Sequence, residues 1–222
     1  MMVYNYNMNY IEEYNTRKLG QPFISNQDFE VKKAFDVFTQ EQIDEIYSAV
    51  NSTSIEDTHL QEWAGHRAWH VKFSKDVEDT ITKAAQAILG DGVVLEGDYS
   101  FARYTPEYGF NCKLFPHYDT RDQQRITFDI QLNADEPWGI VVENEMYHLN
   151  NNEALIFAGT QQIHWREDKT LQPNTKIDMI FCHLQYVGGK ELDPGQKEIL
   201  EDRSKFLMDN TGINSGVQRY GV

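Results

Sequence analysis

The spacing of apolar positions predicts helices in the first part of the chain. Apolar residues recur at helical intervals behind Thr39, and Thr39 with Gln42 forms the pattern of a capping box. We therefore predict a helix that begins there, preceded by a short strand around residues 34–37. A second amphipathic helix is predicted across KDVEDTITKAAQAIL, residues 75–89, and Gly90 is expected to end it.

From residue 93 the pattern changes to short segments rich in β-branched and aromatic residues, separated by Gly, Asn, Asp and Pro. Closely spaced strands of this kind are typical of a sandwich or a barrel. The predicted strands lie in residues 93–104, 125–133, 138–144, 146–150, 153–159 and 176–187. The fold class predicted from this order is mainly β with flanking helices (α+β).

No repeat, low-complexity run or linker divides the chain, so we expect one domain over residues 1–222. Within it, residues 1–92 would hold an extended N-terminal arm and the helices, and residues 93–187 would form the β core. Residues 188–222 would be a tail that contains one more amphipathic helix.

Charge and composition exclude several classes of partner. The formal net charge is −15 and no basic stretch interrupts it, so neither nucleic acid nor an anionic membrane surface is an expected partner. No run approaches the roughly 18 apolar residues of a membrane span, and the N-terminus does not resemble a secretory signal. We expect a cytoplasmic protein, with Cys112 and Cys182 as free, buried thiols.

The stretch CKLFPHYDTRD holds a His-x-Asp pair, His117 and Asp119. Residues i and i+2 of a strand point to the same face, so this pair at a strand end would place an imidazole beside a carboxylate. His164 follows 47 residues after His117, behind an apolar strand and Gly159. Two histidines and one carboxylate form the facial triad of non-haem Fe(II) sites, which leaves three coordination positions open.

The remaining histidines fit a metal site less well. His66 and His70 have the i, i+4 spacing of a helical chelate, but GHRAWHVKF alternates like a strand, in which these two residues stand too far apart. His59 lies in a polar stretch and is expected in solvent. His148 and His183 are expected to be core or rim histidines with hydrogen-bond partners.

An ordered set of segments resembles the Fe(II)- and 2-oxoglutarate-dependent dioxygenases, in particular their prolyl-4-hydroxylase-like branch. The segments are FARYTPEYGFNCKLFPHYD, FDIQLNADEPWGIVVENEMYHLNNNEALIFAGTQQIHWRED and NTKIDMIFCHLQYV. The resemblance implies a double-stranded β-helix (jelly-roll) core with helices packed on one sheet. It also implies Fe(II) held by His117, Asp119 and His164, with 2-oxoglutarate and O2 as cosubstrates and succinate and CO2 as products.

The resemblance further implies a cation for the distal carboxylate of 2-oxoglutarate, about ten residues after the second histidine. Lys176, 12 residues past His164, is the first candidate. Strand alternation places Asp178 on the same face as Lys176, where it would compete for the lysine. Arg166 is the second candidate because a guanidinium grips a carboxylate with two hydrogen bonds, although we expect it nearer the substrate or the metal rim.

Tyr104 resembles the family tyrosine that helps to hold the cosubstrate carboxylate, and Tyr108 is its alternative. On the strand after the metal motif, either Arg125 or Thr127 could face the cavity. No acid–base constellation, phosphate loop or nucleophile motif accompanies these residues.

Two other interpretations use the same residues. The His/Asp/His set could bind zinc in a hydrolase, or the jelly-roll could be a binding module without catalysis. For an oxygenase, the resemblance favours hydroxylation of a prolyl or other amino-acid side chain in a protein or peptide, followed by a small-molecule substrate. The sequence predicts neither the substrate nor the oligomeric state.

Overall fold

The computed structural model describes residues 29–62, 64–117, 119, 125–143, 145–186 and 198. The expected N-terminal arm lies outside these residues, as does the expected C-terminal helix apart from Glu198. None of the helices in the described ranges is long and apolar enough to cross a membrane.

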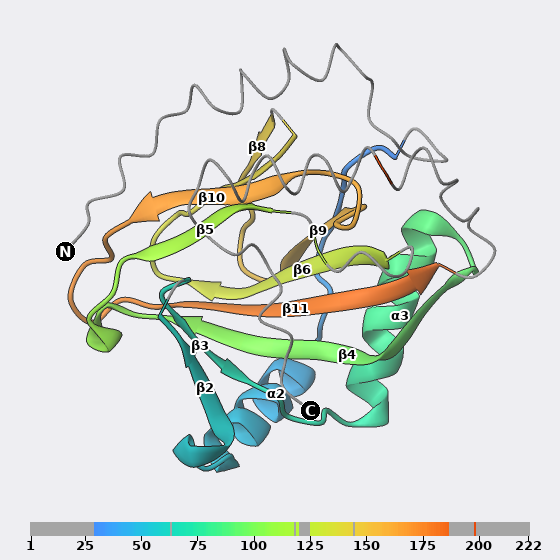
Figure 1. The fold of residues 1–222 in the computed structure, drawn as a ribbon. Coiled ribbons are helices and arrows are strands. Elements are labelled where there is room, and N and C mark those ends of the chain that lie inside the picture. Colours follow the sequence, from blue (N-terminus) through green and yellow to red (C-terminus); the bar gives the residue numbers. More distant parts are fainter. Residues whose placement is uncertain are drawn as a thin grey trace.

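The described strands form two sheets that lie face to face (Figure 1). The larger sheet has seven strands in the order β1-β9-β6-β11-β4-β3-β2, and the smaller has four in the order β5-β10-β7-β8. All of the strand pairs are antiparallel. The strand bounds are β1 Lys32–Ala34, β2 Thr58–Gln61, β3 His66–Trp69, β4 Val93–Tyr104, β5 Cys112–His117, β6 Arg125–Ala134, β7 Ile140–Val142, β8 Glu145–Tyr147, β9 Glu153–Phe157, β10 His164–Lys169 and β11 Ile177–Tyr186.

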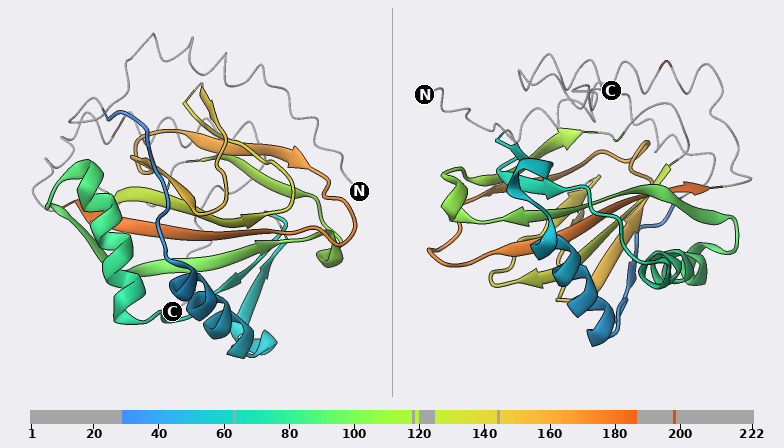
Figure 2. Two further views of the ribbon diagram at one scale, coloured as in Figure 1. Left: turned by 180° about the vertical axis from the view of Figure 1, so that it is seen from behind. Right: turned by 90° about the horizontal axis from the view of Figure 1, so that it is seen from below.

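Both predicted helices are present, and both cover the outer face of the larger sheet (Figure 2). Helix α2 (Gln40–Ser52) begins with the predicted capping box, in which Thr39 Oγ1 accepts a hydrogen bond from the Gln42 amide. Helix α3 (Lys75–Leu89) ends at Gly90, whose φ of 89° suits glycine. Short 3-10 turns cover Ile55–Asp57 and Pro106–Tyr108.

Alternation along the long central strands separates an outer apolar core from the space between the sheets. Phe128 and Ile130 of β6, with Ile180 of β11, pack into the core beneath the helices. Met179 of β11 instead joins a second cluster, which includes Tyr104 of β4 and lies between the two sheets. A polar residue that alternates with these core residues along β6 or β11 therefore faces the interior of the jelly-roll.

The larger sheet also includes strands from the first part of the chain. β1, β2 and β3 all precede residue 93, the expected start of the β core. The strand-like alternation around His66 is confirmed, whereas β2 lies in a stretch that showed no strand pattern. β3 pairs with β4 and β2 pairs with β3, so the two strands widen the sheet beside the interior space.

Candidate metal centre

The two histidines of the predicted triad meet at one end of the smaller sheet. His117 is the last residue of β5 and His164 is the first residue of β10. The two strands are antiparallel, with His117 and His164 as direct Cα partners, so residues 47 positions apart stand side by side. Their rings have centroids 4.1 Å apart.

Asp119 lies just beyond β5 and is anchored to the segment that follows β9. Its amide donates a hydrogen bond to the Gly159 carbonyl oxygen at 2.9 Å. Its Oδ1 atom lies 3.6 Å from His117 Nε2 and 3.5 Å from His164 Nε2. The three residues each offer one ligand atom, and these atoms all lie within 4.8 Å of one another. Within the described ranges, no other group of His, Cys, Asp and Glu side chains has such an arrangement.

The hydrogen bonds and charges around the triad favour metal ligation. His164 Nδ1 lies 3.0 Å from the Gln162 carbonyl oxygen, to which it can donate a hydrogen bond, so Nε2 is the nitrogen available to ligate a metal. Burial raises the pKa of Asp119, but the neighbouring His164, His183 and His117 outweigh it and hold that pKa well below its usual range. Asp119 is therefore a carboxylate, as a metal ligand must be.

His183 and Thr127 lie beside the triad, on the inner faces of β11 and β6. The Thr127 hydroxyl donates a hydrogen bond to Asp119 Oδ2, and His183 Nδ1 lies 3.8 Å from the same oxygen. Thr127 was one of two candidates to face the cavity, but His183 was expected only as a core or rim residue. Alternation along the strand could have identified His183, because His183 and Met179 are four residues apart on β11 and therefore point to the same, inner face.

A second polar group lies deeper between the sheets, around Arg166 of β10. The Arg166 side chain is 2% exposed, and its Nη1 donates to the Trp138 carbonyl at 2.6 Å. Tyr104 is fully buried, and its ring meets that of Trp138 at 4.8 Å. Asp129 on β6 is buried as well. Burial raises its pKa to about 6, although the charges of Arg166 and His164 lower it.

This interior group has polar atoms without hydrogen-bond partners. They are Arg166 Nε and Nη2, the Tyr104 hydroxyl and His66 Nδ1. Buried donors are almost always satisfied in proteins, so several unpaired ones in one place indicate a site for a polar ligand. The unpaired fork of a guanidinium is matched to a carboxylate.

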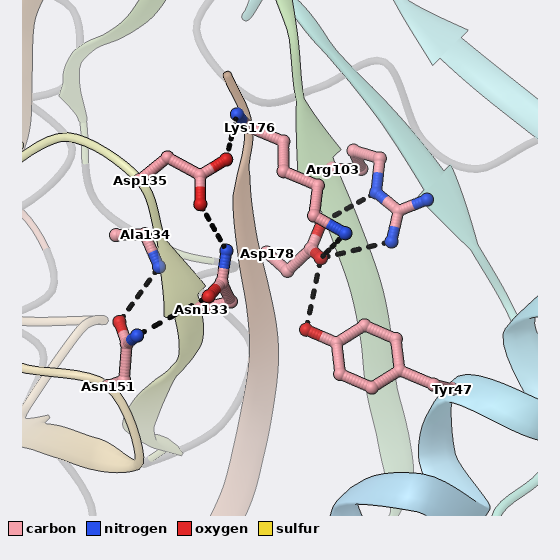
Figure 3. A network of polar contacts seen from close by, with 8 residues as sticks. All are labelled: Tyr47, Arg103, Asn133, Ala134, Asp135, Asn151, Lys176 and Asp178. Carbon is pink, nitrogen blue, oxygen red and sulfur yellow. Dashed lines mark hydrogen bonds and ion pairs between the residues drawn. The ribbon is translucent and has the colours of Figure 1, made fainter. Parts of the chain in front are cut away.

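Lys176 does not lie with this group (Figure 3). Its side chain is 42% exposed on the helix-covered side of the larger sheet, with Nζ 3.5 Å from Asp178 Oδ2 and 5.6 Å from the ring centre of Tyr47. Asp178 is fully buried there and also binds Arg103 through two hydrogen bonds. Asp178 and Lys176 lie on one face, as predicted, and form an ion pair. This face is the outer face of the larger sheet, away from the space between the sheets.

The other candidates are also apart from the metal centre. Tyr108 lies beneath Arg67, 5.4 Å from its guanidinium carbon. His66 packs against Tyr104, whereas His70 faces His59, so the i, i+4 pair does not converge. The side chain of Arg125 lies outside the described residues.

Comparison with known proteins identifies the fold. No protein-family model matches the chain, and no curated protein matches it in sequence. Solved structures do match. The non-heme alpha ketoglutarate dependent epimerase SnoN from nogalamycin biosynthesis has 10% identity and a TM-score of 0.54, over 81% of this chain and 84% of that one.

Two further structures agree with this match. An oxidoreductase of the 2OG-Fe(II) oxygenase family from Burkholderia pseudomallei has 9% identity and a TM-score of 0.51, over 81% of this chain and 91% of that one. A prolyl-4-hydroxylase from Pseudomonas putida has 12% identity and a TM-score of 0.50, over 72% of this chain and 95% of that one. The predicted fold class is confirmed: the chain has the double-stranded β-helix core of the 2-oxoglutarate oxygenases, with both helices on one sheet.

Proposed function

We propose that the protein is an Fe(II)- and 2-oxoglutarate-dependent dioxygenase. The observation that carries this proposal is the combination of two sites in one jelly-roll: the triad of His117, Asp119 and His164, and the unpaired donors of Arg166 and Tyr104. A zinc hydrolase needs only the first of these sites, and a binding module needs only the second.

The triad fits Fe(II) in the number and type of its ligands. The separations of 3.5 and 3.6 Å between Oδ1 and the two Nε2 atoms would close to roughly 3.0 Å around an octahedral ion held roughly 2.1 Å from each ligand. Two imidazoles and one carboxylate are the ligand set of non-haem Fe(II) oxygenases. When bound, Fe(II) and 2-oxoglutarate supply the oxidising chemistry, with decarboxylation to succinate and CO2 and insertion of oxygen into a substrate C–H bond.

Arg166 is our candidate for the distal carboxylate of 2-oxoglutarate, in place of Lys176. Nε and Nη2 of Arg166 lack acceptors, whereas Lys176 is already paired with Asp178 outside the jelly-roll. The Tyr104 hydroxyl, also unpaired, would donate a further hydrogen bond to the same carboxylate. Because Arg166 and Tyr104 are buried, these donors would contribute more than they would at the surface.

For the substrate, we propose a prolyl or other amino-acid side chain in a protein or peptide, with a small molecule as the alternative. The likeness to a prolyl-4-hydroxylase supports the first, and the likeness to an epimerase from nogalamycin biosynthesis supports the second. The net charge of −15 would attract a basic substrate.

An anaerobic titration tests this function without knowledge of the substrate. Metal-free protein would receive Fe(II) and then 2-oxoglutarate, and the visible charge-transfer band of the chelate would be followed. We expect a band that requires both additions and is lost in His164→Ala. The matched control is His148→Ala, which removes an exposed histidine of the same protein.

Well-folded wild-type protein that binds Fe(II) but gives no band would contradict the proposal. It would leave the zinc hydrolase and the binding module as the remaining interpretations.

A further inference from the structure

The two carboxylate oxygens of Asp119 have different surroundings. Oδ1 faces His117 and His164, the other members of the triad. Oδ2 points the other way, where it accepts the hydrogen bond from Thr127 and lies 3.8 Å from His183 Nδ1. Only one of the two oxygens is therefore directed at the metal position.

Gly159 provides the space that Oδ2 occupies. A Cβ atom at this position would lie 1.9 Å from Asp119 Oδ2 and 2.0 Å from Thr127 Oγ1, which no side chain can tolerate. Gly159 is not among the described glycines with a positive φ, so the constraint is space and not backbone conformation. Its carbonyl also accepts the hydrogen bond from the Asp119 amide, so one residue holds both ends of the aspartate.

His183 completes the surroundings of Oδ2. It projects from β11 toward Oδ2, and its Nδ1 is buried without a hydrogen-bond partner. A small movement of either side chain would bring Nδ1 within donor distance of Oδ2. Thr127, Gly159 and His183 thus come from three different places in the larger sheet and its loops, yet all act on one oxygen atom.

We propose that Thr127, Gly159 and His183 are positioning residues that restrict Asp119 to ligation through Oδ1 alone. With two histidines, a single carboxylate oxygen leaves three of six coordination positions open. A carboxylate that bound through both oxygens would occupy a fourth position, which the cosubstrate and oxygen would otherwise share. This inference rests on the proposed metal site, and it concerns residues that the facial triad alone does not assign.

The number of water molecules on bound Mn(II) tests the proposal directly, because the water-proton relaxivity of each bound ion scales with that number. In Thr127→Val the hydroxyl is lost without change of shape, so Oδ2 is free to reach the metal. We expect the relaxivity per bound Mn(II) to fall by about one third, from three open positions to two. Thr127→Ser keeps the hydroxyl and should behave as wild type.

Two further variants keep the test decisive if Thr127→Val does not fold. His183→Leu should also lower the relaxivity per bound Mn(II). His183→Asn keeps an N–H near the same place and should leave the relaxivity unchanged. Gly159→Ala should displace the carboxylate itself and weaken Mn(II) binding at least about 10-fold. Its matched control is Gly139→Ala, where the new Cβ would crowd the side chains of His148 and Met146 and no triad residue is among its nearest contacts.

The outcomes separate this inference from the proposed function. If wild-type protein binds no Mn(II), the proposed function fails and the positioning role fails with it. If wild-type protein binds Mn(II) and Thr127→Val and His183→Leu both keep the wild-type relaxivity per ion, the positioning role alone is overturned. In Thr127→Val and His183→Leu, weaker Mn(II) binding with unchanged relaxivity per ion would also overturn it, because a purely structural defect has that signature.

Discussion

At the scale of single residues, Arg166 is the most informative side chain in the interior. A guanidinium that is 2% exposed with two unpaired nitrogens carries a large desolvation cost. The nearby Asp129 lowers that cost through its charge, and burial still lowers the pKa of Arg166. Such a residue is expected where a bound ligand supplies the missing acceptors.

Substitution at Arg166 and Lys176 distinguishes the two cosubstrate candidates. Arg166→Gln should weaken 2-oxoglutarate binding on the order of 100-fold, because a buried, fork-shaped pair with the carboxylate is lost. Arg166→Lys should recover part of the affinity, since it keeps the charge but not the fork. Lys176→Met should leave the dissociation constant unchanged. The constant is measured by anaerobic titration of the Fe(II)-loaded protein, and the opposite ranking would return the role to Lys176.

His66 provides a prediction for the pH dependence of stability. Burial lowers its pKa to about 3 in the folded protein, against 6.5 in the unfolded chain. Below pH 6.5 the unfolded chain takes up a proton that folded His66 does not, so stability falls with falling pH between 6.5 and about 3. The loss is about 1.4 kcal/mol per pH unit, or about 2 kcal/mol at pH 5.

Urea unfolding at pH 7.5 and pH 5 measures this effect. His66→Phe has no titrating group and would pack against Tyr104 and Phe181, as His66 does. It should therefore lose about 2 kcal/mol less than wild type between the two pH values. Equal losses in both proteins would show that His66 does not contribute to the acid sensitivity.

At the scale of elements, alternation along a strand could be predicted, but the direction of each face could not. The parity of NTKIDMIF correctly placed Lys176 and Asp178 on one face. Which face looked inward depended on where α2 packs, and no local pattern encodes that. Likewise, the capping box predicted the start of α2, because it involves residues only three apart.

The contact of α2 with the larger sheet depends on the buried carboxylate of Asp178. It accepts hydrogen bonds from Arg103 Nε at 2.6 Å and from the Tyr47 hydroxyl at 3.0 Å. Asp178→Asn should lower the free energy of unfolding by about 3–5 kcal/mol, because Arg103 loses its counter-charge. Tyr47→Phe should cost about 1–3 kcal/mol, since it removes one donor and no charge.

Denaturant unfolding measures both costs, and cosubstrate binding is the control. Because this network lies outside the jelly-roll, the folded fraction of each variant should bind Fe(II) and 2-oxoglutarate with wild-type affinity. A loss of cosubstrate affinity in Tyr47→Phe would contradict the separation of the two faces.

At the scale of the whole molecule, the ordered motifs predicted the jelly-roll and the triad, although identity to the solved structures is only about a tenth. The triad could be found because its residue types are chemically unusual together. The surroundings of Arg166 and His183 could not be predicted from the sequence, because they depend on the register of β10 with β5 and of β11 with β6. Pairing between strands far apart in sequence leaves no mark in either strand alone.

Bound to the proposed ligands His117, Asp119 and His164, a metal should stabilise the whole fold, because these residues lie on β5, in the segment anchored to Gly159 and on β10. Ni(II) at about 100 times its dissociation constant should add about 2.7 kcal/mol. For a chain of this size that is a rise in Tm of roughly 5–10 °C. Thermal unfolding measures it, with His164→Ala as the control. An equal rise in His164→Ala would show that the ion binds elsewhere on this acidic protein.

His164 and Arg166 are two residues apart on one strand, and this fixes the distance between them. Under the proposed roles, the spacing between iron and the anchor of the cosubstrate is set by one peptide segment, roughly 6.6 Å along β10. A relative motion of the two sheets would move His164 and Arg166 together and leave the distance between them unchanged. The protein should therefore discriminate sharply between dicarboxylates of different chain length, and a one-carbon-longer keto diacid should bind less well at every temperature at which the protein stays folded.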